Sequence, residues 1–95
     1  MKAKKLFCVI AYDIADDRRR YKIIKIIEKH GVRINYSVYE CMLTQSQLDK
    51  IQKKIDELIV REEDTVVYYP ICVNCFTKIV YQPKSRKPSI STLIV

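Results

Sequence analysis

The chain has 95 residues, 48% of them hydrophobic, which is enough for one small domain with a buried core but not for several domains. No apolar stretch approaches the ~20 residues that span a membrane, and the first apolar run meets Tyr12 and Asp13 instead of a signal-peptide cleavage site, so a cytoplasmic protein is expected. The formal net charge is +7, and more than half of the Lys and Arg residues lie at or before Arg33, which favours an anionic partner such as nucleic acid over a basic but inert surface.

The first predicted element is a buried strand over residues 6–14, which are apolar on both alternating faces. Asp13, near its end, is unusual because a carboxylate at this point of a buried strand needs a role. A run of acidic and then basic residues follows at once, over positions 16–20. Asp13 can hold a divalent metal ion against phosphate, or it can brace the turn into the next helix. The spacing alone leaves both interpretations open.

A helix is predicted after this strand, with Asp16 or Asp17 as its N-terminal cap. Gly31, the single glycine of the chain, stands where a helix C-cap requires left-handed backbone geometry. His30, the single histidine, is expected to interact with the terminal carbonyl groups of the helix, which argues against a His-based triad. The apolar face of the helix comprises Tyr21, Ile23, Ile24, Ile26 and Ile27.

Two strands, a second helix and a further strand follow. Residues 32–43 alternate well, and typical strand lengths favour two strands with a break near Ser37. Residues 44–47 have the form of a capping box, and residues 65–71 are β-branched and aromatic, with Pro70 indicating a strand end or a sheet edge. The helix between them is predicted from the spacing of Leu48, Ile51, Ile55, Leu58 and Ile59.

The C-terminal part is predicted to hold a short strand at residues 78–82, a linker at 83–89 and an apolar strand at 90–95. The chain therefore divides into a domain of residues 1–82 and a linker with a C-terminal strand at 83–95. The order of the elements is the ferredoxin-like βαββαβ pattern of the α+β class, with both helices on one face of an antiparallel sheet. The uncovered face of such a sheet favours a homodimer.

The four cysteines form two groups. Cys8 and Cys41 lie in apolar strand patterns, where cysteine acts as a small hydrophobe. Cys72 and Cys75 form a lone C-x-x-C, which supplies too few ligands for a zinc site, since such sites usually have four. A structural role is favoured for this pair, with a redox pair or an intersubunit metal site as the alternatives.

Metal-dependent hydrolysis of phosphodiester bonds is the candidate chemistry. Mg²⁺, or another divalent cation such as Mn²⁺, takes oxygen ligands and often uses only one or two carboxylates. Asp13 is the best candidate ligand, and two copies across a dimer axis would make a more complete site. The predicted catalytic set is Tyr12, Asp13, Arg20, Arg33, Ser37 and Tyr39, with Arg18, Arg19 and Lys22 as further phosphate-binding candidates. The basic residues can instead form a solvated surface that binds no substrate, and the two tyrosines can instead pack in the core.

Three segments carry a resemblance to a known family. They are VIAYDI at residues 9–14 with Asp16, Asp17 and Arg20 after it, GVRINYSVYEC at residues 31–41 and, more loosely, DTVVYY at residues 64–69. Together they resemble the CRISPR-associated protein 2 family, the small partner of the spacer-acquisition integrase. The resemblance covers nearly the whole chain.

The resemblance implies a ferredoxin-like fold, a homodimer and a magnesium site formed by Asp13 of each subunit. It implies a metal-dependent endonuclease acting on RNA or duplex DNA or, alternatively, a non-catalytic bridge between two integrase dimers that holds the spacer DNA. A toxin-like ribonuclease of the same fold class is a third reading. Residues 90–95 fit the family's extra strand, which crosses the dimer and meets the integrase. Asn35, Tyr39 and Lys22 depart from residues common in the family, which leaves catalytic competence open.

Overall fold

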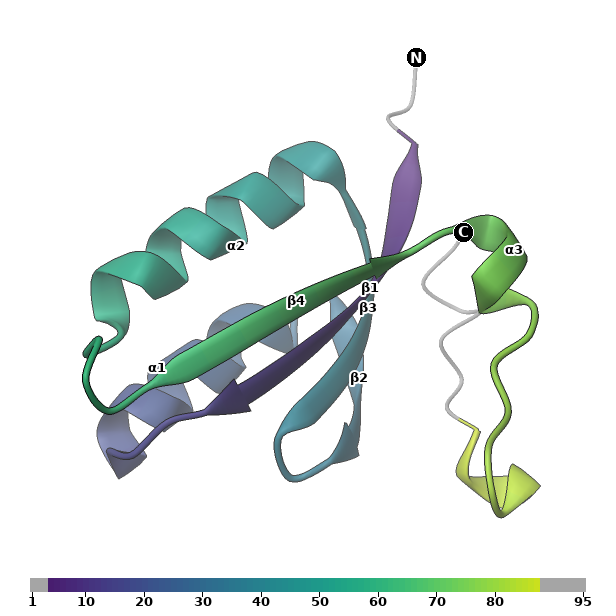
Figure 1. The fold of residues 1–95 in the computed structure, drawn as a ribbon. Coiled ribbons are helices and arrows are strands. Elements are labelled where there is room, and N and C mark those ends of the chain that lie inside the picture. The colour runs from purple at the N-terminus through teal and green to yellow at the C-terminus, as the bar shows by residue number, and fades with distance from the viewer. Residues whose placement is uncertain (1–3, 88–95) are drawn as a thin grey trace.

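A four-stranded antiparallel sheet in the order β2-β3-β1-β4 organises the computed structural model, which describes residues 4–87. Figure 1 shows helices α1 and α2 together on one side of this sheet, which confirms the predicted ferredoxin-like arrangement. The elements are β1 (Lys5–Asp13), α1 (Asp17–Ile27), β2 (Gly31–Asn35), β3 (Val38–Thr44), α2 (Gln45–Leu58), β4 (Thr65–Ile71), the single turn α3 (Val73–Phe76) and the 3-10 turn η1 (Lys84–Arg86). None of the helices in this part of the chain is long and apolar enough to cross a membrane.

The core fills the space between the sheet and the two long helices. Its fully buried side chains are Cys8, Ile10, Ile23, Ile27, Cys41, Leu43 and Ile55. Cys8 and Cys41 lie opposite each other in the register of β1 and β3, and burial raises the pKa of the Cys41 thiol to about 12. This thiol therefore stays protonated and packs as a small hydrophobe, as predicted. Tyr21, predicted on the apolar face of α1, is instead exposed, and the Lys25 ammonium lies 5.2 Å from its ring centre.

Both helix starts are capped as the sequence predicts. The Asp16 carboxylate accepts a hydrogen bond of 2.9 Å from the Arg19 backbone N–H. At the second helix the Gln47 backbone N–H donates to Thr44 Oγ1 at 3.1 Å, while the Gln47 side chain accepts from the Thr44 backbone N–H at 2.8 Å. These bonds satisfy backbone donors that a helix start otherwise leaves without partners.

The prediction of a left-handed C-cap at Gly31 is wrong. Helix α1 already ends at Ile27, and no glycine in the described residues has a positive φ. Gly31 instead opens β2, where an added Cβ would lie 2.6 Å from the Glu40 carbonyl oxygen and closer still to Cys41 Sγ. Glycine is required here because two strands approach closely, and not because the backbone turns.

The turn between β2 and β3 separates two strands near Ser37, as predicted. Asn35 Oδ1 accepts a hydrogen bond of 3.1 Å from the Ser37 backbone N–H, which closes the turn. The Ser37 carbonyl oxygen accepts a hydrogen bond of 3.0 Å from the Tyr12 backbone N–H. The turn is thereby attached to the end of β1, where Asp13 lies.

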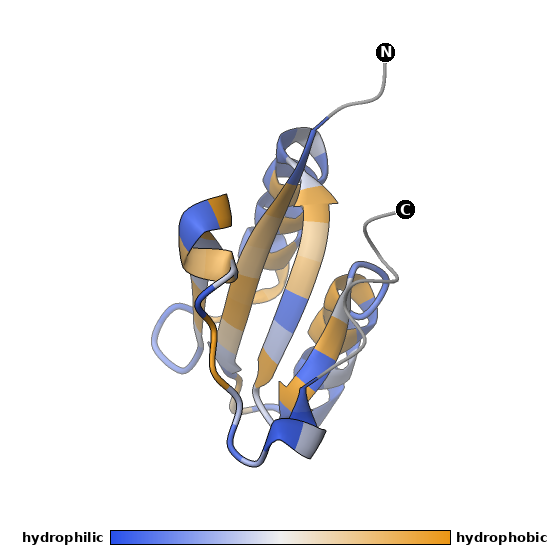
Figure 2. Ribbon diagram, turned by 90° about the vertical axis from the view of Figure 1, so that its right-hand side faces the viewer, coloured by the Kyte–Doolittle hydropathy of each residue, from blue (hydrophilic) through white to orange (hydrophobic). Residues whose placement is uncertain are grey.

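The segment after β4 crosses the face of the sheet that α1 and α2 leave uncovered (Figure 2). The Phe76 and Phe7 rings lie 4.7 Å apart, and the Tyr81 hydroxyl donates to the buried Glu40 carboxylate, 2.6 and 2.8 Å from its two oxygens. The predicted strand at 78–82 is wrong, because the backbone N–H groups of residues 77–79 turn back onto the carbonyl groups of residues 73–76. The predicted strand at 90–95 lies outside the described residues.

Tyr81→Phe is expected to destabilise the domain by about 1–3 kcal/mol. Removal of the hydroxyl takes away the one side-chain donor that the Glu40 carboxylate has within residues 4–87, and an unsatisfied buried acceptor carries this cost. Urea unfolding measures the change. Tyr69→Phe is the matched control, because Tyr69 is 53% exposed, and it should change stability by less than about 0.5 kcal/mol. Equal effects of the two substitutions would contradict an anchoring role for Tyr81.

Candidate active site

A groove of about 340 Å³ opens at the end of β1. Its walls come from four places in the chain: the end of β1, the first turn of α1, strand β2 and the β2–β3 turn. The lining residues are Tyr12, Asp13, Ile14, Arg20, Arg33, Tyr36 and Ser37. Five of the six predicted catalytic residues therefore meet in one place, although they are up to 25 positions apart in the sequence.

Asp13 is the last residue of β1 and lies opposite Thr65 at the start of β4. Its side chain is exposed, and among residues 4–87 no hydrogen bond or ion pair to its carboxylate is found. An exposed carboxylate on a fixed strand end suits a hard cation, which prefers oxygen ligands. The described residues contain no group of three or more His, Cys, Asp or Glu side chains that could hold a metal by themselves. Asp13 is thus the one carboxylate among the residues that line this groove.

Two arginines bring positive charge to the groove. The Arg20 guanidinium donates to the Ile14 carbonyl oxygen at 2.9 and 3.2 Å and pairs with Asp17 at 2.7 Å. Arg33 donates at 3.2 Å to the carbonyl oxygens of both Asn35 and Tyr36. Backbone contacts hold both side chains before any ligand arrives, which lowers the entropic cost of binding a phosphate.

Tyr12 contributes by position. Its side chain is buried, and its hydroxyl donates a hydrogen bond of 2.7 Å to the Tyr36 carbonyl oxygen. Burial, assisted by the neighbouring Tyr39, raises the pKa of this phenol, while Arg33 and Arg20 act in the opposite direction. The phenol therefore stays protonated near neutral pH, and its one hydrogen holds the turn that carries Ser37.

The structure separates the remaining predicted residues from the groove. Tyr39 is buried with its ring centre 6.4 Å from that of Tyr12, so it packs in the core instead of facing a substrate. Arg18 and Lys22 are exposed on α1 and do not line the groove. Arg19 is the clearest correction, because its guanidinium is bound to Asp64 and Glu63. It is occupied as a structural cation and is not free for phosphate.

Asp64 is the residue that sequence reasoning missed. Its side chain is fully buried, and it accepts hydrogen bonds from the Arg19 guanidinium, from the Ala15 backbone N–H at 3.0 Å and from the Val60 backbone N–H at 2.9 Å. The next residue, Thr65, pairs with Asp13. Asp64 thus ties the turn after Asp13 to the loop before β4. The position of Asp64 directly before a strand was the available sign of a structural role. Four charged residues stand in a row at 61–64, however, and the sequence does not show which of them is buried.

Stability should fall in acid in a way that depends on Asp64. The hydrogen bonds from Arg19, Val60 and Ala15 hold the pKa of this carboxyl well below its ordinary value of 3.8, although burial acts against them. The stabilisation is therefore complete above that value and is lost as the pH falls below it toward the folded-state pKa. Urea midpoints between pH 7 and pH 2 measure this. Wild type should lose stability more steeply than Asp64→Asn below about pH 4, and parallel losses would contradict the assignment.

His30 lies outside the groove. Its backbone N–H donates to the Ile27 carbonyl oxygen at 3.0 Å. Burial, followed by the nearby Lys29, Lys5 and Lys54, lowers the pKa of its imidazole. The predicted contact of His30 with the carbonyl groups of the helix end is thus made by its backbone N–H.

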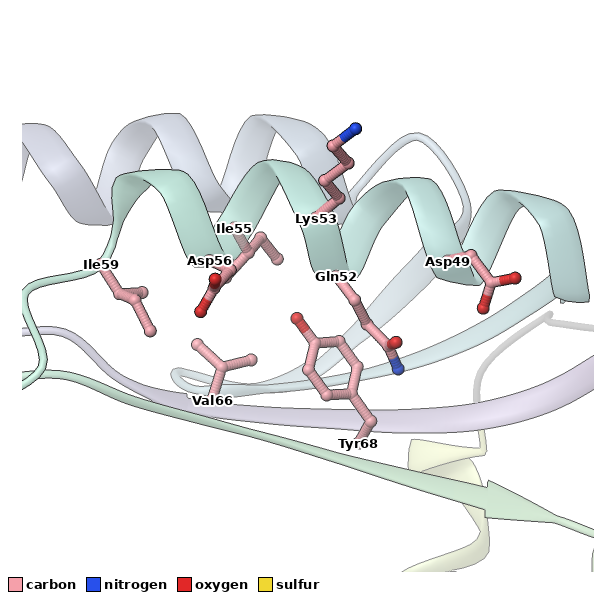
Figure 3. A pocket seen from close by; sticks show the side chains of 8 residues that line it. All are labelled: Asp49, Gln52, Lys53, Ile55, Asp56, Ile59, Val66 and Tyr68. Carbon is pink, nitrogen blue, oxygen red and sulfur yellow. The ribbon is translucent and has the colours of Figure 1, made fainter.

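A second hollow, of about 450 Å³, lies between α2 and the edge strand β4 (Figure 3). Tyr68 points from β4 toward α2, and Asp49 and Asp56 line the same hollow. Burial, assisted by neighbouring groups, raises the pKa of the Tyr68 phenol to about 12. Lys53 also lines the hollow but offsets only one of the two carboxylates, so the net charge stays negative and the hollow is a poor place for nucleic acid.

A family model described as CRISPR associated protein Cas2 matches residues 6–79. The chain belongs to the Cas2 family. A CRISPR-associated endoribonuclease Cas2 from Synechocystis sp. is 39% identical over 88 residues, which are 90% of this chain and 96% of that protein. The family predicted from the three motifs is therefore confirmed.

Solved structures agree on the fold. A crystal structure of Streptococcus pyogenes Cas2 matches with a TM-score of 0.70 at 20% identity, covering 79% of this chain and 96% of that one. A hypothetical protein from Thermus thermophilus matches with a TM-score of 0.67 at 32% identity, covering 72% and 83% of the two chains. The groove at Asp13 thus lies in a Cas2 fold.

Proposed function

We propose that this Cas2 protein is a metal-dependent endonuclease that cleaves phosphodiester bonds of RNA, acts as a homodimer and serves CRISPR spacer acquisition. The observation that carries the proposal is the groove, in which one exposed carboxylate, Asp13, lies with two held guanidinium groups and Ser37. The name endoribonuclease, borne by the Synechocystis relative, supports RNA as the first substrate to test. Duplex DNA is the second.

Asp13 of each subunit would hold the metal, Mg²⁺ or Mn²⁺, in this proposal. A bound ion of this kind polarises the phosphate and lowers the pKa of water. The chain's own residues do the rest: Arg20 and Arg33 bind the phosphate oxygens, and Ser37 hydrogen-bonds to the substrate backbone. Tyr12 fixes the turn that carries Ser37 and Tyr36. This division of labour requires no histidine, in agreement with the position of His30.

A homodimer is supported by the sheet face opposite α1 and α2. Strand residues that alternate with the buried core point to this face, among them Val9, Ala11 and Val67. Tyr69 lies on the same face and is 53% exposed. The segment after β4 crosses only part of this face, and a second copy would cover the exposed remainder and bring a second Asp13 to the assembly.

The alternative function is a non-catalytic DNA-binding bridge between integrase dimers. The net charge of +7 and the exposed Arg18 and Lys22, both outside the groove, favour it. In that case Lys and Arg hold the DNA backbone without cutting it. The two functions differ in one respect that can be measured, namely the need for Asp13 and a divalent metal.

Removal and return of metal is the first experiment. Wild-type protein treated with EDTA should lose cleavage of a labelled single-stranded RNA, and titration with Mg²⁺ or Mn²⁺ should restore it. Duplex DNA of the same sequence is assayed in parallel to rank the two substrates. Binding without cleavage of either nucleic acid at any metal concentration would reject the nuclease and favour the bridge.

A further inference from the structure

We propose that Cys72 and Cys75 form a redox-active dithiol that is oxidised to an intrachain disulfide by low-molecular-weight disulfides. The pair lies where β4 ends at Ile71 and the single turn α3 begins. Asp13 pairs with the opposite end of β4, at Thr65, so the dithiol is separate from the proposed active site. The inference does not depend on the proposed nuclease function.

Packing does not explain these two residues. Cys8 and Cys41 are buried, as structural cysteines usually are, whereas Cys72 and Cys75 are both exposed. Phe76 next to them is the side chain that packs, with its ring 4.7 Å from that of Phe7. Exposure also leaves both sulfur atoms open to a reagent in solution.

The two thiols are close and unequal. Cys72 and Cys75 stand three positions apart on one helical turn, with Cys72 as its N-cap residue, which brings their side chains together. Hydrogen bonding from Cys75 and from nearby backbone groups lowers the pKa of the Cys72 thiol, while the contact with Cys72 raises the pKa of the Cys75 thiol. The Cys72 sulfur is therefore the more suitable attacking thiolate. The Cys75 sulfur is close enough to displace a thiol that becomes attached to Cys72.

A metal site fits less well. Zinc usually takes four ligands, and nowhere among residues 4–87 does a third Cys, His, Asp or Glu join this pair. A C-x-x-C without further ligands is typical of thiol–disulfide chemistry. The helix turn also keeps the two sulfurs together, because the Phe76 backbone N–H donates to the Cys72 carbonyl oxygen at 2.9 Å.

The reaction proceeds in two exchanges. The Cys72 thiolate attacks one sulfur of an oxidised low-molecular-weight disulfide, forming a mixed disulfide and releasing one thiolate. The Cys75 thiol loses its proton to solvent and attacks the Cys72 sulfur, which forms the Cys72–Cys75 bond and releases the second thiolate. The protein is oxidised by two electrons, and the reagent is reduced to two thiols.

The test is oxidation of the reduced, full-length protein by oxidised glutathione, followed by acid quenching, alkylation and mass measurement of the 72–75 peptide. Wild type should lose two hydrogens at this peptide and keep no glutathione. Cys75→Ser should stop at a stable glutathione adduct on Cys72. Cys72→Ser should form an adduct at least about 10-fold more slowly than Cys75→Ser, because it lacks the stabilised thiolate.

Three results would overturn the proposal. The first is equal adduct rates for the two single variants, and the second is a wild-type product linked between two chains. The third is wild-type protein that resists oxidation and retains added zinc after desalting, which would favour an intersubunit metal site instead. Because both residues are exposed, the serine variants should keep the wild-type fold, and their far-ultraviolet circular dichroism provides the check.

Discussion

Asp13→Asn should lower the metal-dependent cleavage rate by at least about 100-fold, since loss of an outer partner of a metal ligand already costs 10- to 100-fold. Asn keeps the shape of the side chain but removes the negative charge that attracts a hard cation. The side chain is exposed and has no ion pair in the described residues, so the fold should not change. Single-turnover cleavage of labelled RNA at saturating Mg²⁺ measures the rate.

The matched control for this substitution is Asp49→Asn. Asp49 is also an exposed aspartate, but it lies on α2 and lines the other hollow. Its replacement should leave the cleavage rate within about twofold of wild type, because it neither touches the groove nor braces the end of β1. Cleavage by Asp13→Asn at the wild-type rate would remove Asp13 from the mechanism.

Asp64→Asn should lower the temperature of thermal unfolding by at least about 10 °C. The substitution removes the negative charge that faces the Arg19 guanidinium, whose side chain is only 18% exposed, and it replaces one of the two oxygens that accept from Ala15 and Val60. Removing one partner of a buried ion pair is costly because the remaining charge stays desolvated. Calorimetry at neutral pH provides the measurement.

Glu63→Gln is the matched control, because Glu63 pairs with the same Arg19 at 3.3 Å but its side chain is 55% exposed, against 0% for Asp64. Exposed ion pairs contribute little, so its unfolding temperature should stay within about 2 °C of wild type. Equal falls for the two variants would show that burial of Asp64 is not the source of the effect.

Sequence patterns over a few residues were sufficient to predict the helix starts, because helix caps depend on neighbouring residues. The capping residues Asp16 and Thr44 bond to groups three positions away, so their roles can be read from spacing. Gly31 and the segment at 78–82 were predicted wrongly because their conformations depend on contacts with β3. A glycine that admits a neighbouring strand looks the same in sequence as one that turns the backbone.

The candidate site likewise has residues that the sequence could predict and contacts that it could not. Asp13, Arg20 and Arg33 were selected by charge and position, and the structure brings them to one groove. The sequence gives no sign that Arg19, one position before Arg20, is bound to Asp64, which lies 45 positions later in the chain. Helix geometry turns adjacent residues to different faces, and the identity of each facing partner is a tertiary property.

The central claim is that one Asp13 per subunit is half of a shared metal site. The activity of mixed dimers tests this claim most directly. Wild-type and Asp13→Asn subunits are mixed in equal amounts, allowed to exchange and assayed for RNA cleavage at constant total protein. If each site needs both carboxylates, only wild-type homodimers cleave, and the activity should be about a quarter of the pure wild-type value. An activity of about half would mean that each subunit carries a complete site, which contradicts the shared-site account.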